Sequence, residues 1–175
     1  MLKIRKASIN DADTMTKLYE ELIDAIKDNE YTPQWEYGVY PKDENILTAI
    51  EDEELYVGEI DSEIVSSIVI NHKPSKGYEQ VKWKIDDEYN NNIYVVHLVA
   101  VKHGHGNKGI AKKMLNYVFD LAKENSIKSV RLSIMENNLP AEKVYKKLDF
   151  EYIDTITIKA DERGLKTFNL YEKLI

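Results

Sequence analysis

The fold is decided by residues 93–109, which read IYVVHLVAVKHGHGNKG. The first part, residues 93–101, is almost continuously apolar, as is typical of a strand that is covered on both faces. The second part, residues 102–109, contains three glycines and predicts a loop. Apolar side chains then recur at helical spacing from Ile110 to Ala122. The stretch therefore predicts a buried strand, a glycine-rich loop and an amphipathic helix in direct succession.

Shorter patterns on either side complete the fold prediction. Apolar runs and alternation predict further strands at residues 2–6, 55–60, 63–71, 128–135, 150–159 and 165–174. Helix-start chemistry and helical spacing predict helices that span about residues 11–26 and 43–50, and a short helix that Asn138 caps. We expect an α+β (mixed α/β) fold, with a mostly antiparallel central sheet, one parallel pair of strands and about four flanking helices.

Composition limits the classes of function. The 175 residues suit a single domain, 1–175. Lys plus Arg number 24 against 31 for Asp plus Glu, and a net charge of -7 argues against nucleic-acid and anionic-membrane partners. The chain has no cysteine, which excludes disulfides and a cysteine nucleophile and fits a reducing compartment. No segment approaches the roughly 20 apolar residues that span a bilayer. We predict a cytoplasmic protein without a membrane partner.

The glycine loop has two functional interpretations. Residues 104–109 match G-x-G-x-x-G, the dinucleotide-binding pattern. A dinucleotide-binding domain needs further strand–helix–strand units, however, and only about 40 residues follow Met135. A loop that leads into a helix can also present main-chain N–H groups to a phosphate. Four lysines surround this loop, Lys102, Lys108, Lys112 and Lys113, and they favour an anionic ligand over a plain tight turn.

The strand and loop belong to a larger pattern that resembles a known family. Aligned on residues 109–111, they are similar to motif A, Q/R-x-x-G-x-G/A, of the GNAT superfamily, the Gcn5-related N-acetyltransferases. Residues 138–150 resemble motif B of that family, N-x-x-A-x-x-x-Y-x-x-x-G-F. Gly106 and Asn107 depart from motif A, so weaker cofactor binding is expected. Asp149 replaces the glycine of motif B, and Asp tolerates a left-handed helix end better than most residues.

The resemblance implies acetyl-CoA as co-substrate and an N-acetyltransferase that acts on a primary amine by direct attack in a ternary complex. It implies that strands 93–101 and 128–135 splay apart, so that freed main-chain groups of Val99 and Val101 pair with the pantetheine. The diphosphate is expected on amides from Gly106 to Ala111. The implied cofactor-binding residues are Val99, Ala100, Val101, Gly106, Asn107, Lys108, Gly109, Ile110, Ala111, Lys112, Asn138 and Tyr145.

Three groups are candidates for the chemistry that the resemblance implies. Tyr145 matches the family's tyrosine and is expected to be the general acid for the leaving thiolate, although a packed aromatic would look the same in the sequence. The backbone N–H near Val99 is the expected oxyanion donor. His97 is the candidate general base, with Glu136 or a chain of waters as alternatives.

The acceptor and the partners are less defined. Tyr31, Trp35, Tyr37 and Tyr40 form an aromatic-rich loop, and Trp83 precedes an acidic run, residues 86–88; both could hold a cationic amine or simply be a lid and a solvated charge run. We expect a small-molecule or peptide amine, a monomer or homodimer, and no metal. The alternative function is a catalytically silent module that binds acyl-CoA and regulates a partner.

Overall fold

The computed structural model describes residues 1–175 apart from the side chain of Asn90. Contacts within the chain define two compact units, each assembled from three segments. Unit 1 comprises Met1–Asn29, Gln34–Ile70 and His97–Val118, and unit 2 comprises Glu30–Pro33, Asn71–Val96 and Phe119–Ile175. Because the chain crosses from one unit to the other several times, neither unit is a continuous piece of sequence. The single domain 1–175 stays a prediction.

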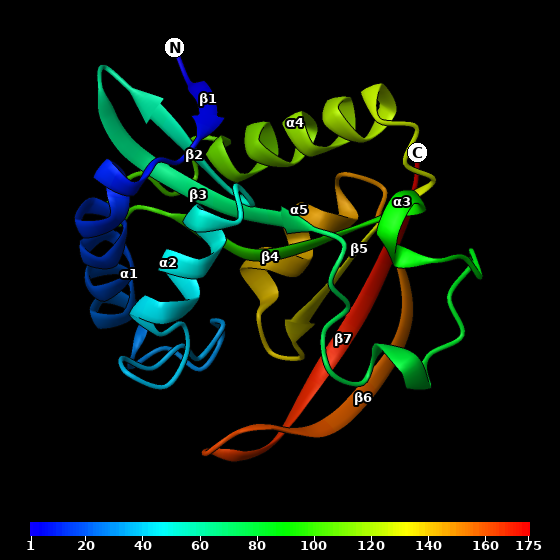
Figure 1. The fold of residues 1–175 in the computed structure, drawn as a ribbon. Helices are drawn as coiled ribbons and strands as arrows, with labels where there is room; N and C mark the ends of the chain where they lie inside the picture. The colour runs from blue at the N-terminus through cyan, green and yellow to red at the C-terminus, as the bar shows by residue number, and fades with distance from the viewer. The chain divides into compact units, whose positions relative to one another are not determined.

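Seven strands form one mixed sheet in the order β1-β2-β3-β4-β5-β7-β6. Figure 1 labels the strands. They are β1 (Lys3–Lys6), β2 (Leu55–Ile60), β3 (Glu63–Asn71), β4 (Ile93–Val101), β5 (Ser129–Met135), β6 (Glu151–Asp161) and β7 (Gly164–Leu174). The longer helices are α1 (Ala12–Ile26), α2 (Asp43–Glu51), α4 (Ile110–Glu124) and α5 (Leu139–Lys146), and α3 (Tyr89–Asn92) is a single turn.

This arrangement confirms the predicted fold class. β4 and β5 pair in parallel, and the pairs β1–β2, β2–β3, β5–β7 and β6–β7 are antiparallel. The glycine loop lies in the single β4–α4–β5 unit, so the serial parallel units of a dinucleotide-binding fold are not formed. Residues 81–85 lie outside the helices and strands. No helix of the described residues is long and apolar enough to cross a membrane.

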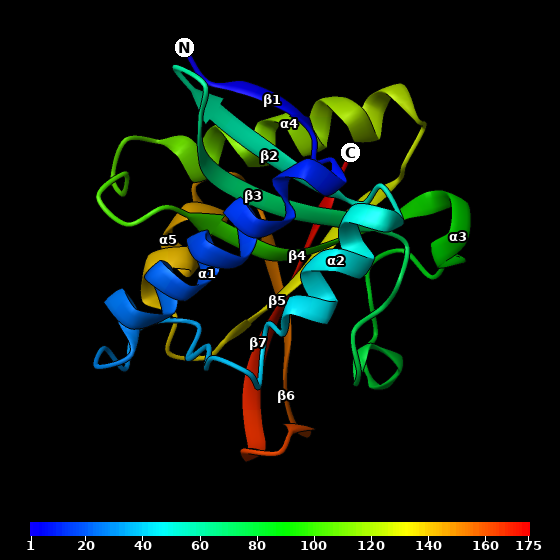
Figure 2. The ribbon, with the colours of Figure 1, turned by 60° about the vertical axis from the view of Figure 1, so that its left-hand side comes forward.

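In unit 1, alternate residues of β2 face two different layers of helices. Leu55 and Val57 are fully buried in a core that α1 and α2 share. Tyr56 and Gly58 face the other side, where the Tyr56 ring lies 5.6 Å from that of Tyr117 on α4. Figure 2 shows α1 and α2 in front of β2 and β3, with α4 behind them. The strand's period of two therefore gives this sheet a covered face on both sides.

Unit 2 is built around antiparallel pairing of β5 with β7 and of β7 with β6. The β6–β7 hairpin is the long orange and red ribbon in Figure 1. The first residues of β4, Ile93–Val95, pair in parallel with Ser129–Arg131 of β5. The buried residues of its core cluster are Tyr78, Val81, Val95, Ile156 and Leu170.

A buried ion pair joins two strands of unit 2 to a loop. Arg131 on β5 is 1% exposed and Glu172 on β7 is fully buried. The Arg131 Nε donates to Glu172 Oε1 at 2.9 Å, and the same carboxylate accepts from the Ser129 hydroxyl and from the Lys84 backbone N–H, each at 2.7 Å. Arg131 also donates to the Ile85 carbonyl oxygen. Because both charges are hydrogen-bonded several times over, their burial is tolerated.

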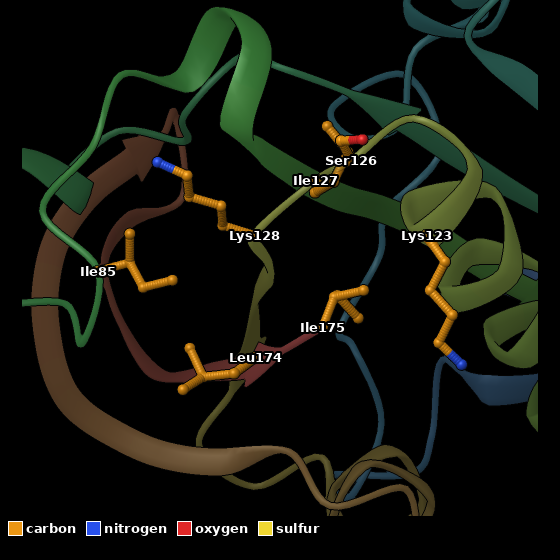
Figure 3. A pocket seen from close by; sticks show the side chains of 7 residues that line it. All are labelled: Ile85, Lys123, Ser126, Ile127, Lys128, Leu174 and Ile175. Carbon is orange, nitrogen blue, oxygen red and sulfur yellow. The ribbon is translucent and has the colours of Figure 1, made fainter.

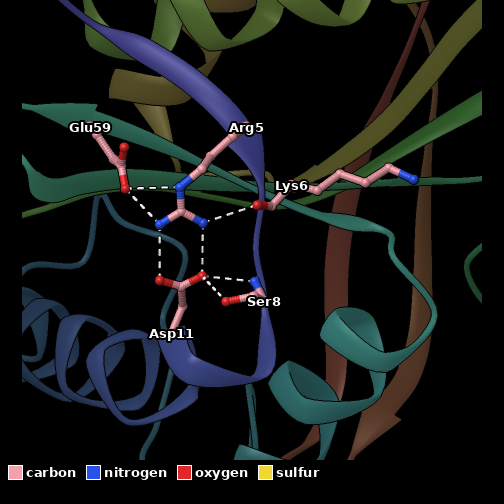
Figure 4. A network of polar contacts seen from close by, with 5 residues as sticks. All are labelled: Arg5, Lys6, Ser8, Asp11 and Glu59. Carbon is pink, nitrogen blue, oxygen red and sulfur yellow. Dashed lines mark hydrogen bonds and ion pairs between the residues drawn. The ribbon is translucent and has the colours of Figure 1, made fainter.

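A second charged network ties the start of α1 to β2 in unit 1 (Figure 4). Arg5 donates to both carboxylate oxygens of Asp11, at 2.8 and 2.9 Å, and to Glu59 Oε1 at 2.6 and 2.9 Å. Asp11 also accepts from the Ser8 backbone N–H at 2.7 Å. The hydrogen bonds from Arg5 hold the pKa of Asp11 well below its ordinary value of 3.8. The fold thus stabilises the ionised form of this carboxyl group.

Removing this charge is expected to destabilise the protein in a pH-dependent way. Because the pKa of Asp11 is lowered on folding, its contribution is complete above about pH 4 and is lost as the pH falls toward the folded pKa. Asp11→Asn should lower the free energy of unfolding by about 1 kcal/mol at pH 7, a value reduced by solvent screening. Urea unfolding at pH 7 and pH 3 checks this, with exposed Asp13→Asn as control. A difference between Asp11→Asn and wild type that is the same at both pH values would contradict the prediction.

Candidate functional site

In unit 1, the predicted cofactor-binding main chain begins on β4, which is kinked at one residue. Ala100 is buried, and Val99 and Val101 are half-buried. Leu98 has a φ of 49°, in the left-handed region that branched and bulky residues rarely adopt. The Tyr19 hydroxyl of α1 donates to the Leu98 carbonyl oxygen at 2.9 Å. A buried side chain therefore holds the strand's irregular point in place.

The glycine loop after β4 is open on its glycine side. Gly104 and Gly109 have φ values of 82° and 72°, and Asn107 has a φ of 60°. A Cβ built on Gly104, Gly106 or Gly109 would meet no atom within 4 Å. These glycines therefore do not make room for another part of unit 1. The positive φ of Asn107 suits its residue type, because asparagine adopts the left-handed conformation more readily than most residues.

Helix α4 starts directly after this loop, at Ile110, and is 15 residues long. The first backbone N–H groups of a helix have no partner within the helix, and its dipole favours negative charge there. Together with the open glycine side, this end of α4 fits a diphosphate group.

The lysines around the loop differ in their surroundings. Lys102 Nζ lies 2.8 Å from a Glu63 carboxylate oxygen and 4.0 Å from one of Glu21. The bond to Glu63 raises the pKa of Lys102. Lys108 and Lys112 are exposed on the loop and on the first turn of α4. Lys102 or Lys108 could replace the Gln/Arg that motif A has in place of Gly106, and Lys108 is the better candidate because Lys102 is already paired with Glu63.

In unit 2, Asn138 and Tyr145 lie at the start and in the last turn of α5. The Asn138 side chain accepts a hydrogen bond from the Ala141 backbone N–H at 3.4 Å, so its predicted role as a helix cap is confirmed. Tyr145 is 5% exposed, and its ring meets that of Phe150 edge-on at 5.6 Å. Asp149 has a φ of 60°, as the left-handed helix end requires. The motif B segment, residues 138–150, therefore packs into the core of unit 2, and it contains the candidate general acid Tyr145.

Burial controls the acidity of the Tyr145 phenol. Desolvation raises its pKa well above the ordinary value of 10, and the neighbouring Tyr78 raises it further. The phenol is therefore a neutral hydrogen-bond donor throughout the physiological pH range. This state is the one that a proton donor to a leaving thiolate needs.

The two candidate bases lie in different units. His97 is half-buried on β4 in unit 1, and Glu136 is exposed after β5 in unit 2. The Glu136 backbone N–H donates to the Thr167 carbonyl oxygen at 3.1 Å. The choice between His97, Glu136 and water stays a prediction.

One of the two regions expected to bind the acceptor contains Trp83, which is half-buried and packs against the core of unit 2. The Trp83 ring lies 4.4 Å from the Arg131 guanidinium and 5.0 Å from the Tyr78 ring. Its Nε1 donates to the Tyr78 carbonyl oxygen at 3.0 Å. Asp87 forms an ion pair with Lys128. Trp83 and Asp87 thus both have structural partners within unit 2, and their role in binding the acceptor stays a prediction.

The other aromatic region contains two half-buried rings and two exposed rings. Trp35 and Tyr40 pack against the core of unit 1, and the Trp35 ring lies 5.6 Å from that of Tyr19. Tyr31 and Tyr37 are 47% and 60% exposed. Tyr31 and Tyr37 thus expose more of their surface than the half-buried Trp35 and Tyr40.

A recess of about 530 Å³ lies in unit 2, and none of its lining residues belongs to the predicted site. Figure 3 shows its lining, which consists of Ile85, Lys123, Ser126, Ile127, Lys128, Leu174 and Ile175. Among the side chains that the structure describes, no group of three or more His, Asp or Glu could hold a metal ion.

Tyr19 and Ser67 form hydrogen bonds near the kink in β4, and the sequence alone predicts no such role for either residue. Tyr19 reads only as part of the apolar face of α1, yet its hydroxyl bonds to Leu98 O and to Ser67 Oγ, each at 2.9 Å. These partners lie 79 and 48 residues further along the chain. No local pattern in the sequence could have identified them.

Solved structures share this fold at low sequence identity. An acetyltransferase of the GNAT family from Streptococcus agalactiae has a TM-score of 0.79 at 20% identity, over 99% of this chain and 95% of that one. A Salmonella typhimurium structure determined with its cofactor acetyl-CoA has a TM-score of 0.70 at 15% identity, over 99% and 94%. A ribosomal-protein-alanine N-acetyltransferase from Brucella melitensis has a TM-score of 0.70 at 16% identity, over 99% of both chains.

Sequence comparison identifies the family. A search of curated protein sequences gives no match. A family model described as the acetyltransferase (GNAT) family, however, matches residues 16–150, a range that includes β4, the glycine loop and α5. Because that match covers well over half of the sequence, the chain belongs to the GNAT family of acetyltransferases.

Proposed function

We propose that this protein transfers the acetyl group of acetyl-CoA to a primary amine of a small molecule or peptide, by direct attack in a ternary complex. The observation that carries the proposal is the open glycine loop, residues 104–109, at the start of α4. Family membership adds the donor, because GNAT acetyltransferases use acetyl-CoA. The cytoplasmic location and the monomeric or homodimeric state stay predictions.

The main chain of unit 1 would hold most of the cofactor. N–H groups from Gly106 to Ala111 would bind the diphosphate, with Lys108 and Lys112 adding positive charge. Main-chain groups of β4 from Val99 to Val101 would pair with the pantetheine amides as an added strand does. In unit 2, Asn138 would contribute a further hydrogen bond to the pantetheine arm.

The chemistry assigns one role to each of three groups. The amine nitrogen attacks the thioester carbon, the C–S bond breaks, and the sulfur leaves with the electron pair and takes up a proton. The Val99 N–H would stabilise the oxyanion, and His97 would accept the proton that the amine loses. Tyr145 would donate to the sulfur, since a phenol carries its proton at neutral pH and can hydrogen-bond to the leaving thiolate.

Two measurements test the proposal. Acetyl-CoA should raise Tm by linkage, and thiol release should show turnover with at least one member of a panel of amines that includes peptide N-termini, lysine, polyamines, aminoglycosides and amino-acid derivatives. Binding without turnover on the whole panel would instead support the silent acyl-CoA-binding module. A Tm shift with NAD and none with acetyl-CoA would contradict both.

Restoring the family's residue at position 106 should strengthen cofactor binding. A side chain there has room, because a Cβ on Gly106 meets nothing within 4 Å, and Gly106 does not have a positive φ. Gly106→Arg should therefore lower Kd for acetyl-CoA about fivefold through a charge-assisted contact. Isothermal titration checks this, with Gly109→Arg as the matched control. Since Gly109 has a φ of 72°, the control should not bind more tightly. An unchanged Kd in Gly106→Arg would disprove the expectation.

A further inference from the structure

The kink in β4 is held by a short, directed chain of hydrogen bonds inside unit 1. A phenol has a single proton, and Tyr19 donates its proton to the Leu98 carbonyl oxygen at 2.9 Å. The contact between Tyr19 Oη and Ser67 Oγ, also 2.9 Å, must therefore have Ser67 as the donor. Ser67 is fully buried, Tyr19 is 2% exposed and Leu98 is 8% exposed. Water does not compete for these bonds, so the chain keeps one direction, from Ser67 through Tyr19 to Leu98.

The acceptor at the end of this chain shares a peptide group with a predicted catalytic donor. The Leu98 carbonyl and the Val99 N–H belong to one planar unit, in which a trans geometry points the two bonds in opposite directions. Fixing the oxygen toward α1 therefore fixes the direction of the Val99 N–H as well. Because hydrogen bonds in series polarise one another, a bond to the oxygen also makes this N–H a stronger donor.

The backbone at Leu98 shows that this orientation is maintained at a cost. A leucine with a φ of 49° is strained, and such strain persists only where surrounding contacts enforce it. A phenylalanine at position 19 would pack against Trp35 equally well. The Tyr19 hydroxyl therefore matters for its hydrogen bonds to Ser67 and Leu98 and not for packing. Without these partners, burying the hydroxyl would be unfavourable.

We propose that Tyr19 is a positioning residue for acetyl transfer, which aims and polarises the Val99 N–H at the developing oxyanion through the Leu98–Val99 peptide. Ser67 supports it by orienting the phenol. This inference rests on the proposed function, and it adds a residue of α1 that lies outside both family motifs.

The direct test is the infrared frequency of the acetyl carbonyl in bound [1-13C]acetyl-CoA, which requires no acceptor amine. In wild type, the Val99 N–H should shift this band to lower frequency than in free acetyl-CoA. Tyr19→Phe should lose at least half of that shift. Ser67→Ala should lose a smaller part, and Ser66→Ala should lose none. Ser66 is the matched control, because it is a fully buried serine on the same strand whose hydroxyl has no hydrogen-bond partner.

Kinetics provide the second readout. With an active amine, Tyr19→Phe should lower kcat about tenfold while KM for acetyl-CoA stays the same, since the lost interaction belongs to the transition state. Tyr56→Phe, another buried tyrosine of unit 1, controls for the loss of a phenol hydroxyl.

The outcomes separate this inference from the proposed function. A full band shift and full kcat in Tyr19→Phe, with only Tm reduced, would overturn the positioning role and leave the acetyltransferase intact. Failure of wild type to bind acetyl-CoA would overturn the proposed function, and the positioning role with it.

Discussion

Tyr145→Phe should lower kcat about 100-fold and leave KM for acetyl-CoA within about twofold of wild type. The change removes only a hydroxyl from a side chain that is 5% exposed, so the packing against Phe150 is retained. What disappears is the donor to the leaving sulfur, whose charge is greatest in the transition state. The loss therefore falls on kcat. Thiol release at saturating amine measures it.

A matched variant separates this effect from a general loss of stability. Tyr171 is also a fully buried tyrosine of unit 2, and its hydroxyl donates to Glu142 Oε1 at 2.8 Å. Tyr171→Phe should lower Tm by several degrees and keep most of kcat. If Tyr145→Phe and Tyr171→Phe have similar kcat values, Tyr145 is a packing residue and the proton donor must be sought elsewhere.

Arg131→Met should destabilise the protein by about 3–5 kcal/mol. Glu172 is fully buried and would lose the cation that its charge requires, while its bonds from Ser129 and Lys84 remain. The change would also free the loop at Ile85, which Arg131 bonds. The free energy of unfolding in guanidinium chloride measures the effect.

The origin of that loss can be isolated with two further variants. Arg131→Met combined with Glu172→Gln removes both buried charges and keeps an oxygen acceptor, so it should be more stable than Arg131→Met alone. Lys128→Met removes the cation of a more exposed pair, whose side chains are 52% and 22% exposed, and should cost under about 1 kcal/mol. If the double variant is no more stable than Arg131→Met, lost packing and not an uncompensated charge explains the effect.

Local chemistry was enough to predict several features. The apolar run, the three glycines and the apolar spacing after Ile110 each act over a few residues, and they predicted β4, the loop and α4 in the observed order. Asn138 as a cap and Asp149 as a left-handed helix end follow from the preferences of single residues, and both are confirmed. The two residues between predicted strands 55–60 and 63–71, Asp61 and Ser62, both have positive φ, as a two-residue hairpin turn needs.

Other features depend on partners that are distant in the sequence. Trp83 precedes an acidic run and reads as a wall for an amine, but Arg131, 48 positions later, places its guanidinium over that ring. Leu98 reads as an ordinary strand residue, although its φ is 49°. The environment of Trp83 and the backbone conformation at Leu98 depend on side chains that are distant in the sequence. The spacing of residues does not reveal which side chains these are.

By itself, the sequence determined the order of strands and helices, the family and the glycine loop, because hydrogen bonds and periodic burial within a segment depend on neighbouring residues. Only the tertiary structure decided which buried polar groups meet. Tyr19 finds the Leu98 carbonyl 79 positions away, and Arg131 finds Glu172 41 positions away. Desolvation makes each of these groups require a partner, but the partner is set by how the segments pack.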